Sequence, residues 1–200
     1  MGDLDESFDL RRTVAVVRIT RHDPAPVYTL TIDNATSGQY LTPANIAVHD
    51  RSVDVFQRGH AAGSELQDLA ENGNVPGMAA LLAAAVDSAG LGASGVAGSG
   101  PIAPGSSATI HVQTRANRIS LVSMLICTND GFAGIDNRPL IMGKGHSLTY
   151  SARAYDAGTE INTEDHDDLV PAPFCGGEGA GSGASNPALA EGGVVDHHRG

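Results

Sequence analysis

Alternating and apolar segments along the chain predict strands. Apolar and polar residues alternate over residues 27–33 (VYTLTID) and 108–114 (ATIHVQT), which is typical of half-buried strands. Residues 13–20 and 147–154 have a similar strand character, and residues 119–127 (ISLVSMLIC) are apolar enough for a central strand buried on both faces. Turn residues separate these segments. The pattern predicts an all-β fold, an antiparallel β-sandwich of about seven strands.

The stretch between about residues 61 and 88 has helical spacing instead. Ser64 and Gln67 match a capping box at the start of a first helix. The pair Asn72-Gly73 ends that helix, and Pro76 suits the first turn of a second one. We therefore expect a short helical insert within the β-sandwich.

Composition divides the chain into three parts. Residues 1–12 are acidic and poor in apolar side chains, so we expect a flexible N-terminal segment. Residues 13–170 contain the predicted β-sandwich domain, in which the small residues of 90–100 predict a flexible loop. Residues 171–200 are rich in glycine, alanine and serine and predict a poorly ordered tail.

The net charge of −11, with one lysine and eleven arginines, argues against a nucleic-acid partner, because binding the phosphate backbone needs a basic surface. The longest apolar run covers nine residues, whereas a membrane span needs about 20. The acidic first residues do not resemble a signal peptide. The protein is therefore either cytosolic or the mature part of an exported protein.

The two cysteines, Cys127 and Cys175, leave two interpretations open. Two free thiols are the favoured one, since two cysteines do not make a disulfide framework. One disulfide bond is the alternative.

Acidic residues gather in two loops that follow strong strands. Asn129, Asp130 and Asp136 lie in a predicted loop over residues 128–138, and Asp156 and Glu160 follow the strand of residues 147–154. If a short strand at residues 139–142 connects the two strands in antiparallel fashion, both loops lie at the same end of the sandwich.

Carboxylates crowded at one end of a sandwich repel one another and suit a hard cation such as Ca²⁺, which takes six to eight oxygen ligands. The spacing from Asp156 to Glu160 differs from that of the EF-hand. The alternative is a solvated acidic loop that needs no ion.

No catalytic motif of the nucleophile-elbow, zinc-protease or phosphate-loop type is found, and the chain has no tryptophan with which to line a sugar cleft. We therefore expect a protein that is not an enzyme. A hydrolase that uses Asp130, Asp156 and Glu160 as acid–base groups or metal ligands remains an alternative, and a purely structural domain of a surface assembly is another.

Taken together and in order, several short motifs resemble the spondin N-terminal domain family, most closely its bacterial branch. The resemblance covers about residues 14 to 165. The motifs that carry it are NATSGQYLTP at 34–43, His49, GSELQDLAENG at 63–73, GPIAPG at 100–105, Ser123-Met124, TNDGF at 128–132 and YDAGTE at 155–160.

The resemblance implies a β-sandwich with a calcium ion at one end, held by Asp130, Asp156 and Glu160. Glu160 replaces an aspartate of the family, and Asp136 matches an aspartate of the animal loop and is a fourth candidate ligand. Animal members are secreted matrix proteins, so we expect a secreted or cell-surface module for adhesion or recognition. A matrix, glycan or cell-surface partner would fit this role, whereas contact with a membrane surface is not indicated.

Overall fold

The computed structural model describes residues 12–22, 26–89, 92–140, 146–163, 165–170, 174–175 and 185–198. The predicted N-terminal segment lies almost wholly outside this part of the chain, as does much of the predicted tail. The elements are β1 (Thr13–His22), β2 (Val27–Asn34), β3 (Ala44–His49), α1 (Ser64–Asn72), α2 (Val75–Ala89), β4 (Ala93–Ala97), β5 (Ser107–Gln113), β6 (Arg118–Met124), β7 (Gly131–Pro139), β8 (Ser147–Asp156), η2 (His166–Asp168), η3 (Pro187–Leu189) and β9 (Asp196–His197).

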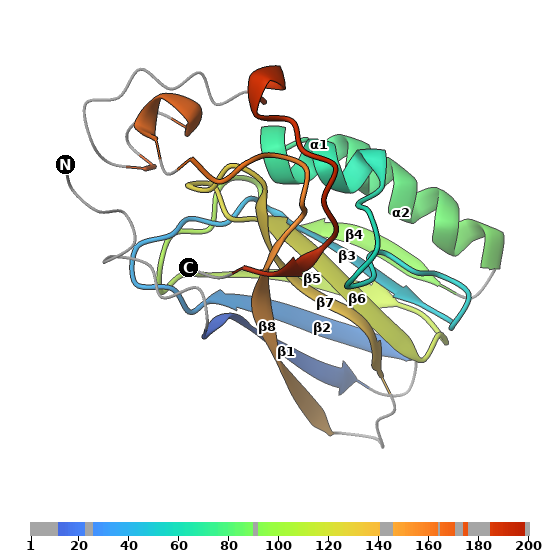
Figure 1. Ribbon diagram of the computed structural model, residues 1–200. Helices are drawn as coiled ribbons and strands as arrows, with labels where there is room; N and C mark the ends of the chain where they lie inside the picture. The colour runs from blue at the N-terminus through green and yellow to red at the C-terminus, as the bar shows by residue number, and fades with distance from the viewer. Residues whose placement is uncertain are drawn as a thin grey trace.

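The strands form one antiparallel sheet in the order β4-β3-β6-β7-β8-β1-β2-β5, with β9 paired to β8. The sheet curls until its two edges approach each other, and its inner face encloses the main core. Strands as far apart in the order as β2 and β3 contribute to that core, through Leu30 and Ile46 among others. The predicted all-β antiparallel fold with a helical insert is confirmed (Figure 1).

The edge strand β4 corrects the prediction of a flexible loop over residues 90–100. Small residues are needed here for close packing rather than for flexibility. A Cβ atom on Gly95 would lie 2.4 Å from Cδ1 of Ile110 on the opposite edge strand, β5. The glycine therefore allows the two edges of the sheet to approach each other.

The helices α1 and α2 cover the outer face of β3, β6 and β7 (Figure 1). Their apolar residues pack around Phe132, which is fully buried. The Phe132 ring stacks on Tyr155 with centroids 5.4 Å apart and meets Phe56 edge to face at 5.1 Å. This apolar cluster between the helices and the outer face of the sheet is separate from the main core, and it holds the helical layer on the sheet.

The ends of α1 are only partly as predicted. The N-cap residue of the helix is Gly63, which has no side chain with which to make a capping hydrogen bond. Ser64 Oγ donates to Glu65 instead, so the predicted capping box is wrong. The predicted stop is confirmed, because Gly73 takes the left-handed conformation at φ 66° that closes the helix.

The C-terminal segment corrects the prediction of a poorly ordered tail, as far as the chain is described. Residues 185–198 contain η3 and β9 and run beside α1 down to β8 (Figure 1). Ser185 N donates to Asn72 Oδ1, and Val195 N donates to the carbonyl of His60. Backbone hydrogen bonds, rather than composition, therefore determine the structure of residues 185–198.

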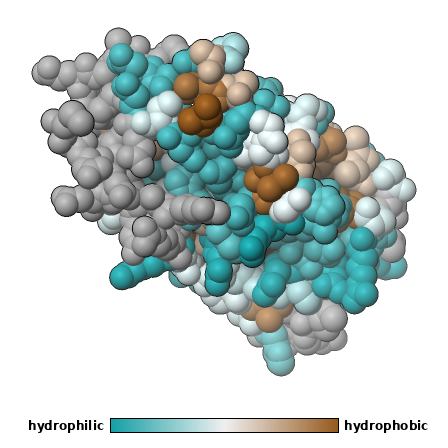
Figure 2. All heavy atoms as spheres, in the orientation of Figure 1, coloured by the Kyte–Doolittle hydropathy of each residue, from teal (hydrophilic) through white to brown (hydrophobic). Residues whose placement is uncertain are grey.

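The face of the molecule in Figure 2 is mostly hydrophilic where it is coloured, with separate hydrophobic spots. Leu81 on α2 is one of the exposed large hydrophobic residues, at 41% exposure. None of the helices in the described residues is long and apolar enough to cross a membrane.

We expect Phe132→Ala to lower the free energy of unfolding by about 3–5 kcal/mol, because it opens a cavity between the helices and the sheet. Leu81→Ala is the matched control on the exposed face of α2 and should change it by about 0.5 kcal/mol or less. Urea denaturation measures both. Equal effects would mean that the helical layer does not pack on the sheet through Phe132.

Candidate functional site

The candidate site lies where β7 begins and β8 ends. These strands are antiparallel neighbours, and Gly131 pairs with Asp156 at the last position of their ladder. The backbone N–H of Ala157 donates to the carbonyl of Asp130 at 3.2 Å. The expectation that Asp130 and Asp156 share one end of the domain is confirmed, although the connecting strand is β7 and not the predicted strand at 139–142.

Asp130 is completely buried and makes unequal use of its two carboxylate oxygens. Oδ2 accepts hydrogen bonds from the backbone N–H groups of Thr159 (2.7 Å) and Glu160 (3.1 Å) and from the Thr159 hydroxyl (3.2 Å). Oδ1 is equally buried but has no hydrogen-bond partner among the described residues. Burial and the neighbouring Asp156 carboxylate raise the pKa of Asp130 to about 6.

Asp156 is half-buried and holds its own loop in shape. Its Oδ1 accepts from the backbone N–H of Gly158 at 2.7 Å, and its Oδ2 accepts from Asn162 Nδ2 at 2.7 Å. Each carboxylate oxygen can accept more than one bond, so both retain capacity for a cation.

Glu160 donates to Asp130 through its backbone N–H, while its carboxylate accepts a hydrogen bond from the C-terminal segment. The side chain is 4% exposed, and Oε1 accepts from the backbone N–H of Asn186 at 2.7 Å. Burial raises the pKa of Glu160, and the hydrogen bond from Asn186 works in the opposite direction. The backbone N–H of Glu160 binds Asp130 directly, and the Asp130 carboxylate is near enough to the Glu160 carboxylate to raise the pKa of Glu160 further.

Asp136 does not belong to this group, which corrects the expectation of a shared loop. It lies within β7, six residues after Asp130, or about 20 Å along an extended strand. Its Oδ1 accepts from Ser120 Oγ at 2.8 Å and from the backbone N–H of Val55 at 3.3 Å. His49 Nε2 lies 2.8 Å from the same Ser120 oxygen, so these polar side chains satisfy one another beneath the helical layer.

Two carboxylates therefore lie close together, and one of their oxygens has no hydrogen-bond partner in the described part of the chain. Within the described residues, no three His, Cys, Asp or Glu side chains form a ready-made metal cluster. The residues fit a hard cation in part: Asp130 and Asp156 can supply oxygens, and backbone carbonyls and water are the usual remaining ligands of Ca²⁺.

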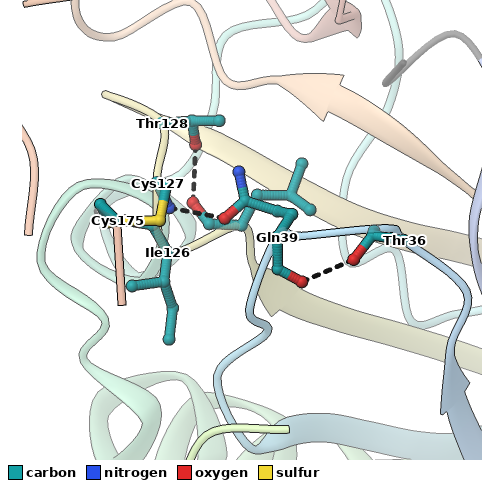
Figure 3. The surroundings of a disulfide bond; sticks show 7 residues. Thr36, Gln39, Ile126, Cys127, Thr128 and Cys175 are labelled. Carbon is teal, nitrogen blue, oxygen red and sulfur yellow. Dashed lines mark hydrogen bonds between the residues drawn. A yellow bond between two sulfur atoms is a disulfide. The ribbon is translucent and has the colours of Figure 1, made fainter. Parts of the chain in front are cut away.

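A disulfide bond lies just before the site, between Cys127 and Cys175, with Cα atoms 5.2 Å apart (Figure 3). The favoured interpretation of two free thiols is thus wrong and the alternative is right. The backbone N–H of Cys127 donates to Gln39 Oε1 at 2.7 Å, and the Thr36 hydroxyl donates to the Gln39 carbonyl (Figure 3). The bond joins the start of the Asp130 loop to a segment 48 residues away.

Sequence reasoning missed the residues that approach the site from the C-terminal segment. Asn186 lies in a stretch whose composition suggested a tail, so no local pattern marked it. His198 lies near Asp156; burial lowers the pKa of His198, and the Asp156 carboxylate opposes that effect. Thr159 lies in the YDAGTE motif, but a threonine there gave no reason to expect a role in the site. Its hydroxyl and its N–H both donate to Asp130.

Comparison with protein families agrees with the motifs. The model of the Spondin_N family, the spondin N-terminal domain, matches residues 38–164, which is more than half of the chain. A comparison with curated proteins finds no match. The match includes the loops of Asp130, Asp156 and Glu160 and all of the helical insert. This chain belongs to the spondin N-terminal domain family.

Proposed function

We propose that this domain is a non-catalytic, calcium-binding module that acts in adhesion or recognition at a cell surface or in an extracellular matrix. The observation that carries the calcium proposal is the Oδ1 atom of Asp130, which is buried, has no hydrogen-bond partner among the residues that the structure describes, and belongs to a carboxylate beside that of Asp156. An unpaired buried charge is costly, and a bound cation removes that cost.

The cation would be held by Asp130 and Asp156, with the remaining positions filled by backbone carbonyls and water. Calcium suits this arrangement better than magnesium, because it accepts irregular oxygen shells of six to eight ligands. When bound, the ion supplies positive charge that cancels the repulsion between the two carboxylates. The chain itself contributes the fixed position of Asp130, which the N–H groups of Thr159 and Glu160 hold.

The disulfide bond supports a location outside the cytosol, since such bonds persist in oxidising compartments and are rare elsewhere. The adhesive or recognition role rests on family membership, because animal members are secreted matrix proteins. A matrix, glycan or cell-surface component is the corresponding partner class.

Calcium should raise the melting temperature, because it binds the folded state only. At calcium near 100 times its dissociation constant we expect a rise of about 5–10 °C. Asp156→Asn removes one ligand charge and should abolish most of this rise. Asp167→Asn is the matched control, since it removes one charge from an exposed aspartate that lies beyond Glu160 and is not a proposed ligand. Differential scanning fluorimetry measures all three, and an unchanged rise in Asp156→Asn would exclude Asp156 from the site.

In the absence of calcium, Asp130→Asn should stabilise the domain at pH 7.5, because asparagine keeps an acceptor for the Thr159 N–H and removes a buried charge. Folding raises the pKa of Asp130 to about 6, so the folded state binds this proton more tightly than the unfolded one. Below pH 6 the wild type gains that proton, and the advantage of the variant should shrink by about 2–3 kcal/mol on going to pH 4. Denaturation in chelator at both pH values is the measurement. A pH-independent difference between the two proteins contradicts the raised pKa.

The protein secreted from its host should carry no free thiol. Alkylation without reduction should leave its intact mass unchanged, and alkylation after reduction should add two groups. Replacing both cysteines by serine should lower the free energy of unfolding by about 2–4 kcal/mol, because the bond closes a long loop. Alkylation of the unreduced secreted protein would contradict both the bond and its support for an extracellular location.

A further inference from the structure

The C-terminal segment of residues 185–198 lies along the loop of residues 157–161 and is called the strap below. Figure 1 shows it descending from η3, next to α1, to β9 on β8. Three backbone hydrogen bonds join it to the loop: Ile161 N to Leu189 O (2.8 Å), Glu191 N to Thr159 O (2.9 Å) and Gly193 N to Gly158 O (2.8 Å). The first two form an antiparallel bridge between Glu160 and Ala190.

The loop leaves no space between itself and the strap. Gly158 has φ 70°, and a Cβ atom placed on it would lie 2.5 Å from the backbone nitrogen of Val194. At the far end, the His197 ring stacks on Tyr155 with centroids 4.9 Å apart, and Arg58 pairs with Asp196 at 2.7 Å. The strap is therefore docked along its whole described length.

Glu160 connects the strap to the candidate cation site. Its backbone N–H donates to Asp130 Oδ2, while its carboxylate accepts the N–H of Asn186 and a hydrogen bond from the Ser185 side chain. Glu71 of α1 and Asp130 both stand near the same carboxylate and raise its pKa, so these hydrogen bonds offset burial and two like charges. The hydrogen bonds that this carboxylate accepts come from the strap.

We propose that Glu160 is a positioning residue and not a cation ligand: its carboxylate anchors the strap, and the docked strap holds the 157–161 loop where two of its N–H groups fix Asp130. The part that concerns the cation rests on the proposed calcium function; the anchoring does not.

The coupling acts in both directions. A loop that the strap has already ordered loses less conformational freedom when a cation binds, so undocking the strap should weaken calcium binding. By linkage, calcium should tighten the strap by the same factor. The cation site and the C-terminal segment then behave as one unit, although they are distant in sequence.

The test uses Glu160→Gln, which keeps the Oε1 acceptor, and Glu160→Ala, which removes it, with Asp156→Asn as the reference for a lost ligand. In calcium-free protein, hydrogen exchange of the strap amides should rise about 10–100-fold in Glu160→Ala and stay near the wild-type rate in Glu160→Gln. Exchange in β6 should be unchanged in both, which shows that the fold is intact. Calcium titration should give Glu160→Gln an affinity within about 3-fold of wild type and a loss of about 10-fold or more in Asp156→Asn.

Two results would overturn the proposal: a loss of calcium affinity in Glu160→Gln as large as in Asp156→Asn, with the strap still protected, or a strap that stays protected in Glu160→Ala. If Glu160→Ala does not fold, the comparison of Glu160→Gln with Asp156→Asn decides the question. A wild-type domain that binds no calcium, while Glu160→Ala still frees the strap, supports the anchoring and overturns the calcium function instead.

Discussion

The buried carboxylate of Asp130 is the constraint on which this end of the domain depends. A charged group with no exposed surface must be satisfied from within the protein, and here the neighbouring loop does this with two backbone N–H groups and a hydroxyl. That arrangement uses only Oδ2. The conformation of the 157–161 loop and its contacts with the strap are tied to the position of this one carboxylate, whose Oδ1 atom has no hydrogen-bond partner among the described residues.

Many of the motif residues that identify the family serve as supports for that end of the sheet. Asn34 donates from Nδ2 to the carbonyls of Gln39 and Ile102, both at 2.8 Å, and so joins its own loop to a segment 68 residues away. Gln39 in turn receives the N–H of Cys127. Thr128 closes the turn before Asp130 by accepting the N–H of Gly131 at 2.9 Å. Asn34 and Gln39 are buried and Thr128 is half-buried, and the hydrogen bonds of these polar side chains fix the positions of the loops.

The site is therefore built from two kinds of contribution. Local chemistry supplies the acids, and both Asp130 and Asp156 stand in motifs that a reader of the sequence can find. Their relative placement comes from the antiparallel ladder of β7 and β8, which sets Gly131 opposite Asp156. Local chemistry alone does not identify the site residues. Asp136 is close to Asp130 in sequence, but it lies within β7 and accepts a hydrogen bond from Ser120 instead.

The sequence by itself determined the all-β class, the helical insert and the two acidic segments, because alternation, helical spacing and turn residues are local properties. Whether residues 93–97 and 131–139 were strands or loops depended on partners elsewhere in the sheet: Gly95 is small because it faces Ile110, and β7 is completed by pairing with β6 and β8. The pairing of Cys127 with Cys175 and the docking of residues 185–198 were likewise decided only by tertiary structure. A glycine-rich composition describes how freely a segment moves when nothing binds it. In this domain the described residues 185–198 find hydrogen bonds on a distant loop, where Glu160 accepts the N–H of Asn186, 26 residues further along the chain.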